Sequence, residues 1–152
     1  MSTDKIEKHV ELKASLSRVW RAITDSTEFG EWFGVALTSP FVAGAIVRGN
    51  ITSKGYEHLT AELHIDRVDE AARIFAFRWH PFAIDPAVDY SSEPMTVVQF
   101  ALTETTRGTH LEIIETGFDA LPASRRTKAF AANGEGWTIQ AKNLTDHLAK
   151  VA

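Results

Sequence analysis

A change of hydrophobic period near residue 122 constrains this chain more than any other feature of its sequence. Beyond Pro122 the apolar and small residues recur every three or four positions, which is the spacing of one face of an α-helix. These residues are Phe130, Gly134, Trp137, Ala141, Leu144 and Leu148. The pattern predicts one amphipathic helix from about Pro122 to Lys150, with Trp137 and Leu144 facing the rest of the protein.

Six earlier segments alternate apolar and polar residues, which is typical of half-buried β-strands. They cover residues 6–13, 45–52, 58–68, 74–79, 96–103 and 109–116. Between the first two segments, Ser15 offers a helix N-cap, and Asp25 forms a capping-box pattern with Glu28. We therefore expect two short helices after the first strand.

An apolar sheet face must be covered, and the C-terminal helix is the one predicted element long enough to cover it. We therefore expect an α+β helix-grip fold, in which a curved antiparallel sheet of about six strands wraps around that helix. No segment repeats another and no Pro- or Gly-rich linker divides the chain, so residues 1–152 are expected to form a single domain. Residues 81–94 contain three prolines and are expected to form a flexible loop or lid.

Charge and composition exclude several classes of function. The formal net charge of −4 and the scattered basic residues create no field that attracts phosphates, so no nucleic-acid partner is expected. The absence of cysteine excludes thiol nucleophiles and thiolate metal sites. The first residues carry charges in place of an apolar stretch, which predicts no signal peptide, no membrane insertion and a cytoplasmic location. No nucleotide-binding or hydrolase motif is present, so we expect no cofactor.

Small residues of the long helix face large rings of the strands in this arrangement. Gly134 and Ala141 would lie opposite Phe77, Trp79 and Phe100, which indicates either close packing or a ligand-sized cavity. Four tryptophans in one small domain favour the cavity. Its expected lining consists of Trp32, Phe33, Phe77, Trp79, Phe100, Phe130, Trp137 and Ala141.

Two charged side chains are candidates for orienting a ligand in that cavity. Glu115 follows Leu111 and Ile113 by alternation. It points either into the cavity mouth, where burial would suit it to acid–base work, or to solvent at the strand end, which we expect more strongly. Arg48 would anchor a ligand carboxylate if its strand turns that face inward.

One group of residues has the composition of a metal site. His58, Glu62 and His64 are metal-ligand types on one predicted strand. The two histidines would lie about 20 Å apart along an extended strand, on its solvent face, which is too far to share an ion. We therefore expect no metal site.

Several short motifs resemble those of a known family, in the same order along the chain. They are VWRAITD at 19–25, EWFG at 31–34, THLEI at 109–113, ETGF at 115–118, GW at 136–137 and HL at 147–148. The motifs are similar to those of the activator-of-heat-shock-ATPase homologue family, which belongs to the START-like (SRPBCC) superfamily. One departure is Ala43-Gly44-Ala45, where family members often carry a Gly-Gly pair.

The resemblance implies the helix-grip fold, with a cavity between sheet and helix. The relatives that it implies include lipid carriers, polyketide aromatases and cyclases, and co-chaperones. Because their functions differ, the resemblance supports the fold of this chain better than its function. Three functions stay open. The chain binds a small apolar, aromatic or lipid-like ligand; it catalyses a cyclase- or aromatase-like reaction in which Glu115 or a histidine moves protons; or it contacts a protein partner, either a chaperone or a second copy of itself. No catalytic motif is visible, so we expect binding rather than catalysis.

Overall fold

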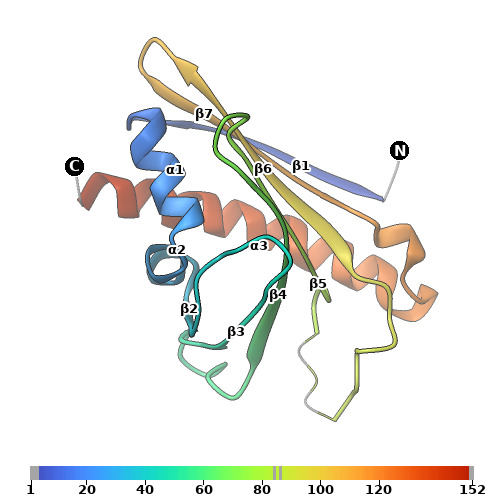
Figure 1. Ribbon diagram of the computed structural model, residues 1–152. Helices are drawn as coiled ribbons and strands as arrows, with labels where there is room; N and C mark the ends of the chain where they lie inside the picture. The colour runs from blue at the N-terminus through green and yellow to red at the C-terminus, as the bar shows by residue number, and fades with distance from the viewer. Residues whose placement is uncertain (1–3, 84, 86, 151–152) are drawn as a thin grey trace.

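The computed structural model describes residues 4–83, 85 and 87–150, and it has the α+β helix-grip architecture (Figure 1). Its strands are β1 (Lys5–Leu12), β2 (Val35–Leu37), β3 (Ile46–Ile51), β4 (Thr60–Asp69), β5 (Ile74–Trp79), β6 (Thr96–Thr105) and β7 (Gly108–Thr116). Its helices are α1 (Leu16–Thr24), α2 (Ser26–Phe33) and α3 (Ala123–Lys150), with a 3-10 turn, η1 (Phe118–Ala120), ahead of α3.

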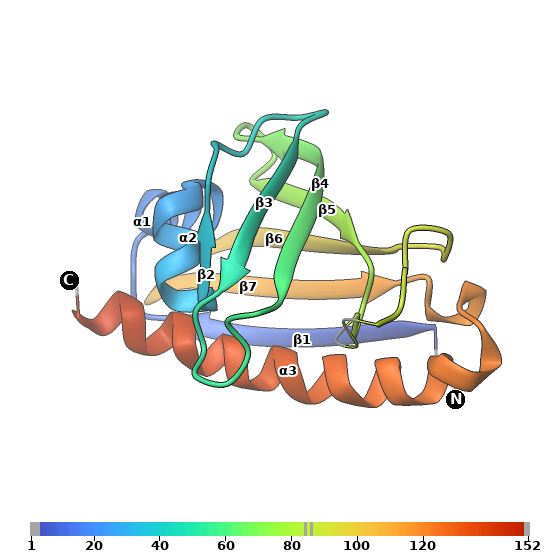
Figure 2. The same ribbon diagram turned by 90° about the horizontal axis from the view of Figure 1, so that it is seen from below.

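The strands form one sheet in the order β1-β7-β6-β5-β4-β3-β2, and each strand is antiparallel to its neighbours. From β2 to β7 the chain is a meander of consecutive hairpins, while β1 lies beside β7 at one edge. Figure 2 shows α3 running along one side of the curved sheet, with α1 and α2 gathered near its C-terminal half. The sheet therefore grips the long helix, as the sequence predicts.

β2 is the strand that the sequence does not predict. Its three residues are too few to reveal an alternating pattern. It pairs with β3, where Leu37 lies opposite Gly49. A Cβ atom at Gly49 would lie 2.1 Å from the carbonyl oxygen of Ala36, so only glycine permits this close approach of the two backbones. The sheet consequently has seven strands in place of the expected six or so.

The two short helices begin where their capping residues predict. Ser15 Oγ accepts a hydrogen bond from the backbone N–H of Arg18 at 3.2 Å, and Asp25 Oδ1 accepts one from that of Glu28 at 3.1 Å. Gly34 ends α2 with a φ of 92°, in the left-handed region that glycine adopts at low cost. This turn leads the chain directly into β2.

The long helix confirms the change of hydrophobic period. It covers Ala123–Lys150, within one residue of the expected bounds. Trp137 and Leu144 are only 2% and 1% exposed, so the predicted stripe is the buried face of the helix. Gln140 Nε2 also donates a hydrogen bond to the carbonyl oxygen of Phe33 at 2.8 Å, which joins α3 to the end of α2.

Phe29 stands at the centre of the aromatic core. It is fully buried, and its ring centroid lies between 4.8 and 6.5 Å from those of six other rings. These rings belong to Trp32, Phe33, Phe41, Phe75, Phe77 and Phe100. These six rings come from α2, β5, β6 and the segment before β3. The side chain of Phe29 therefore packs α2 against the sheet.

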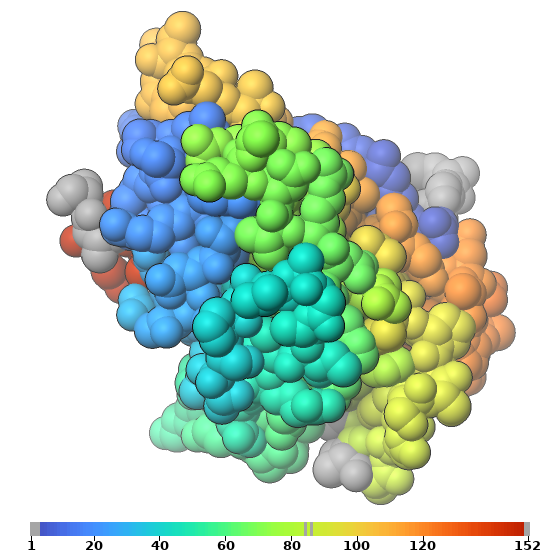
Figure 3. Space-filling view, in the orientation of Figure 1, coloured from blue at the N-terminus to red at the C-terminus, as the bar shows by residue number. Residues whose placement is uncertain are grey.

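The loop between β5 and β6 is tied to the start of α3. Arg125 Nη2 pairs with Glu93 at 2.8 Å, and the same guanidinium donates hydrogen bonds to the carbonyl oxygens of Pro81 and Phe82, each at 3.0 Å. It also lies 4.6 Å from the centre of the Tyr90 ring. Figure 3 shows this yellow-green loop beside the orange start of the helix. Two positions of the loop lie outside the described residues; the described part is held by these contacts.

Glu28 joins the three α-helices through one partly buried carboxylate. Its oxygens lie 2.5 Å from Arg18 Nη2, 3.3 Å from Arg21 Nε and 2.7 Å from His147 Nε2. Burial alone would raise the pKa of this carboxyl, but the hydrogen bonds from His147 and Arg18 outweigh burial and hold the pKa below its usual value. The ionised form is therefore the one that stabilises the fold.

We expect Glu28→Gln to lower the free energy of unfolding by about 2 kcal/mol at neutral pH, because charge-assisted hydrogen bonds become neutral ones. Since the pKa is lower in the folded state than in the unfolded state, this stabilisation is present above the ordinary value of 4.5 and is lost as the pH falls through the folded-state pKa. Urea unfolding at pH 7 and at pH 3 measures it. The deficit should shrink at pH 3, and an equal deficit at both pH values would contradict the assignment. The exposed Glu31→Gln is the control, with a change below about 0.5 kcal/mol.

Candidate ligand-binding site

A pocket of about 240 Å³ lies where α2, β5 and α3 meet. Its lining consists of Phe33, Trp79, Asn133, Gly136, Trp137, Ile139 and Gln140. The lining is mostly apolar and contains no charged side chain. Ile139 is 53% exposed, so the pocket opens to the surface along α3.

Three aromatic rings form the wall of the pocket. The ring of Phe33 lies 6.0 Å from that of Trp79 and 6.0 Å from that of Trp137, centroid to centroid. The two indoles lie 5.7 Å apart with 29° between their planes. Because the rings come from three different elements, the wall exists only in the folded protein.

A buried carboxylate lies behind this aromatic wall. Glu115, on β7, is fully buried. Its Oε2 accepts hydrogen bonds from Trp79 Nε1 at 2.8 Å and Thr96 Oγ1 at 2.5 Å, and its Oε1 accepts one from Trp137 Nε1 at 2.8 Å. The amide of Asn133 donates to both oxygens, at 3.0 and 3.1 Å. Each indole of the wall is therefore held edge-on to the same carboxylate.

Helix α3 leaves empty space where it borders the pocket. A Cβ atom built on Gly136 would meet no other atom within 4 Å. Gly134, two residues earlier, differs in that its Cβ would lie 4.0 Å from Ile6 Cδ1, an ordinary van der Waals contact with β1. Neither position requires glycine for its backbone, yet glycine weakens a helix interior relative to alanine. Gly136 therefore borders open space in the lining of the pocket.

The structure brings three of the ten predicted site residues together at the pocket: Phe33, Trp79 and Trp137. Phe77 and Phe100 lie deeper and are fully buried in the core. The other aromatic and small residues of the predicted lining lie outside the pocket. Trp32 donates its indole N–H to the carbonyl oxygen of Ala22, Phe130 packs against Phe118, and Ala141 is half-buried on α3.

The two charged candidates occupy opposite faces of the sheet. β3 turns Arg48 outward, where it pairs with Glu62 at 3.3 Å, while its neighbour Val47 is buried. Glu115 points inward, so the stronger expectation, that it reaches solvent at the strand end, is wrong. The physical reason is that donors from β5, β6 and α3 converge on it and replace the water that a carboxylate otherwise needs.

Sequence reasoning misses five residues of this site. They are Thr96, Asn133, Gly136, Ile139 and Gln140. Two signals were available: Thr96 continues the inward alternation of Val98 and Phe100, and Asn133 precedes Trp137 by one helical turn. A polar residue on an apolar stripe indicates a buried partner.

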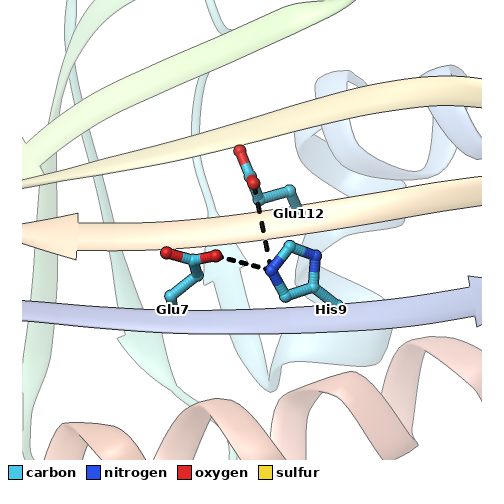
Figure 4. Close-up of side chains that lie close together, drawn as sticks. All are labelled: Glu7, His9 and Glu112. Atoms are coloured by element: carbon cyan, nitrogen blue, oxygen red, sulfur yellow. Dashed lines mark hydrogen bonds and ion pairs between the residues drawn. The ribbon is translucent and has the colours of Figure 1, made fainter.

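Histidine and acidic residues gather on the solvent face of β1 and β7, outside the pocket (Figure 4). The ligand-type atoms of Glu7, His9 and Glu112 lie within 4.8 Å of one another, with His9 Nε2 2.6 Å from Glu7 and 3.9 Å from Glu112. Glu7 also pairs with Lys5 at 2.9 Å, and all of these groups are partly or largely exposed. Ordinary surface ion pairs account for this grouping.

The three residues weighed as metal ligands in the sequence lie apart from the pocket as well. β4 begins at Thr60, so His58 precedes the strand and is exposed. Glu62 and His64 share the outer face of β4 and lie 2.8 Å apart. Arg48 also contacts Glu62, so the three side chains form a small cluster on the surface.

The sequence of residues 13–149 matches the family described as activator of Hsp90 ATPase homolog 1-like protein. The chain belongs to this family. The match covers nearly the whole chain and confirms the resemblance carried by the short motifs. No curated protein matches this family member in sequence.

Solved structures that share the fold of this activator-homologue family member come from several bacteria. Protein MLL2253 from Mesorhizobium loti is 20% identical, with a TM-score of 0.75 over 97% of this chain and 98% of that one. Protein NE0264 from Nitrosomonas europaea is 16% identical, with a TM-score of 0.75 over 99% and 97% of the two chains. DynU16, from the dynemicin biosynthetic locus, is 23% identical, with a TM-score of 0.73 over 96% of this chain and 47% of its own. These likenesses show the fold alone.

None of the described helices combines the length and the apolar character that crossing a lipid bilayer requires.

Proposed function

We propose that this family member binds a small, largely apolar ligand in the pocket between α2, β5 and α3. The observation that carries the proposal is the pocket of about 240 Å³ walled by Phe33, Trp79 and Trp137. Binding sites for small molecules are typically concave and apolar, with a few polar groups that fix orientation. Asn133 and Gln140 supply the polar atoms of the lining, although the amide nitrogen of each already donates a hydrogen bond within the protein.

The residue at position 136 adds support. A glycine in the interior of a helix costs stability, and a Cβ atom at Gly136 would meet no other atom within 4 Å. Close packing against a neighbouring element therefore does not explain the glycine, whereas a pocket that binds a ligand at this point would.

A cyclase- or aromatase-like reaction is less well supported by the site. Such a reaction would need Glu115 or a histidine to exchange a proton with the ligand. Four donor groups already occupy both oxygens of Glu115, and no histidine of the described residues lines the pocket. The carboxylate is therefore arranged to hold the indoles rather than to reach a ligand.

Gly136→Leu tests the proposal, because the new side chain should fill the pocket without displacing its wall. We expect at least a tenfold loss of affinity for N-phenyl-1-naphthylamine, a neutral probe whose fluorescence rises on binding in apolar pockets. Gly134→Ala is the matched control, since it adds a side chain to the same helix toward Ile6. It should keep the affinity and raise the free energy of unfolding by about 0.5–1 kcal/mol. Equal probe binding by wild type and Gly136→Leu would contradict the proposed site.

A further inference from the structure

We propose that the pocket selects ligands that carry a positive charge next to an aromatic or aliphatic body, such as arylalkyl ammonium cations. This inference rests on the proposed function, because it names the class of ligand for the same pocket. It is carried by a buried carboxylate that lies behind the aromatic wall and, among the described residues, has no ion-pair partner.

Neutral donors surround the carboxylate of Glu115. Its hydrogen-bond donors are two indoles, a hydroxyl and a primary amide, all of them neutral. Within residues 4–83, 85 and 87–150, no lysine, arginine or histidine side chain forms an ion pair with it. Neutral donors stabilise a buried carboxylate but leave its net charge in place. The ionised carboxylate, whose oxygens accept all of these donors, therefore carries a negative charge that no ion pair of the described residues balances.

Both indoles of the wall are hydrogen-bonded to this carboxylate. Trp79 and Trp137 each donate their Nε1–H to a different oxygen of Glu115, while their rings line the pocket. An indole whose N–H is bound to an anion has a more electron-rich ring face, and tryptophan is already the best aromatic partner of a cation. Phe33 adds a third ring at 6.0 Å from both. The wall thus places three aromatic rings, two of them indoles, at the position that an ammonium group would occupy in the pocket.

Among the described residues, the rest of the lining supplies no charged group. Asn133, Gly136, Ile139 and Gln140 are all uncharged. A ligand carboxylate would find no counter-ion here and would be repelled by Glu115, whereas a cation would complement its field. Fatty acids, which the lipid-carrier relatives would suggest, are therefore poor candidates for this pocket.

Three probes of nearly the same shape test the inference on the wild-type protein. They are benzyltrimethylammonium, its neutral isostere neopentylbenzene and the anion 3-phenylpropanoate, each measured by displacement of N-phenyl-1-naphthylamine. We expect the cation to bind about tenfold more tightly than the neutral isostere, equivalent to about 1.4 kcal/mol, and the anion to bind most weakly. A neutral or anionic probe that binds as tightly as the cation would overturn the inference and leave the proposed binding function intact. Failure of all three probes and of the fluorophore would overturn the proposed function itself.

Two variants locate the source of the preference. Glu115→Gln removes the charge and keeps one acceptor oxygen, so the cation should lose about tenfold in affinity while neopentylbenzene changes by less than about threefold. Trp79→Phe keeps a ring on the wall and removes one link to the carboxylate, and it provides a second reading if Glu115→Gln does not fold. It should reduce the preference for the cation about threefold. An unchanged preference in a folded variant of either kind would contradict the role of Glu115.

Discussion

Replacing Glu115 with alanine is expected to lower the free energy of unfolding by about 4 kcal/mol. The substitution leaves the buried N–H groups of Trp79 and Trp137, the hydroxyl of Thr96 and the amide of Asn133 without their common acceptor. Each unsatisfied buried donor costs about 1–3 kcal/mol, and water that enters the new space recovers part of the total. Such a loss is a large share of the stability of an ordinary domain. Urea unfolding followed by tryptophan fluorescence measures it.

Glu112→Ala is the matched control for this prediction. Glu112 lies on the same strand, three residues earlier, but on the solvent face. Its ion pair with His9 is long, at 3.9 Å. The control should change the free energy of unfolding by less than about 0.5 kcal/mol. Equal losses for the two variants would mean that the buried network contributes nothing beyond a surface carboxylate.

Replacing Phe29 with alanine is expected to have an effect of similar size, about 4 kcal/mol. The side chain is fully buried, and its ring has six aromatic neighbours within 6.5 Å. Its loss leaves a cavity whose rigid aromatic walls cannot collapse readily, which is the condition for a large loss of stability. Thermal and urea unfolding monitored by circular dichroism report the change.

Phe130→Ala removes the same chemical group from a less enclosed position. Phe130 is half-buried. Among the described rings, the one that packs against it is that of Phe118, with 5.4 Å between the ring centroids. We expect a loss of about 2 kcal/mol, close to the value for burial of the side chain without a large cavity. If both variants lost the same amount, Phe29 would not be the centre of the core.

The fold was predictable where a pattern was long enough to show its period. The stripe that ends in Leu148 places α3 within one residue of its observed start, and the alternation around Leu63 places β4 on the sheet with the correct face inward. β2 was not predictable from alternation, because three residues hold no period. The signal that remained was Gly49, a glycine inside a strand, which indicates that another backbone approaches closely.

The site was predictable only in part, because its polar contacts join distant segments. The helical and strand periods predict that Trp79 and Trp137 face each other, and alternation predicts that Glu115 points inward; both orientations are observed. Whether an inward carboxylate at a strand end reaches water depends on side chains from other elements, here Thr96 and Asn133. The spacing of residues within one segment does not predict such contacts between segments. The pocket opening at Gly136 likewise depends on what stands opposite the helix.

The two donors that α3 supplies to Glu115 also restrict where the helix can lie on the sheet. An apolar stripe by itself tolerates a helix that slides along a sheet by one turn, because large apolar side chains exchange places at small cost. Asn133 and Trp137, one helical turn apart, both reach the carboxylate in the observed position, and a slide of one turn would move one of them away from it and leave its N–H group without this acceptor. The buried charge therefore selects a single alignment of α3 on the sheet among several that the apolar contacts alone would permit.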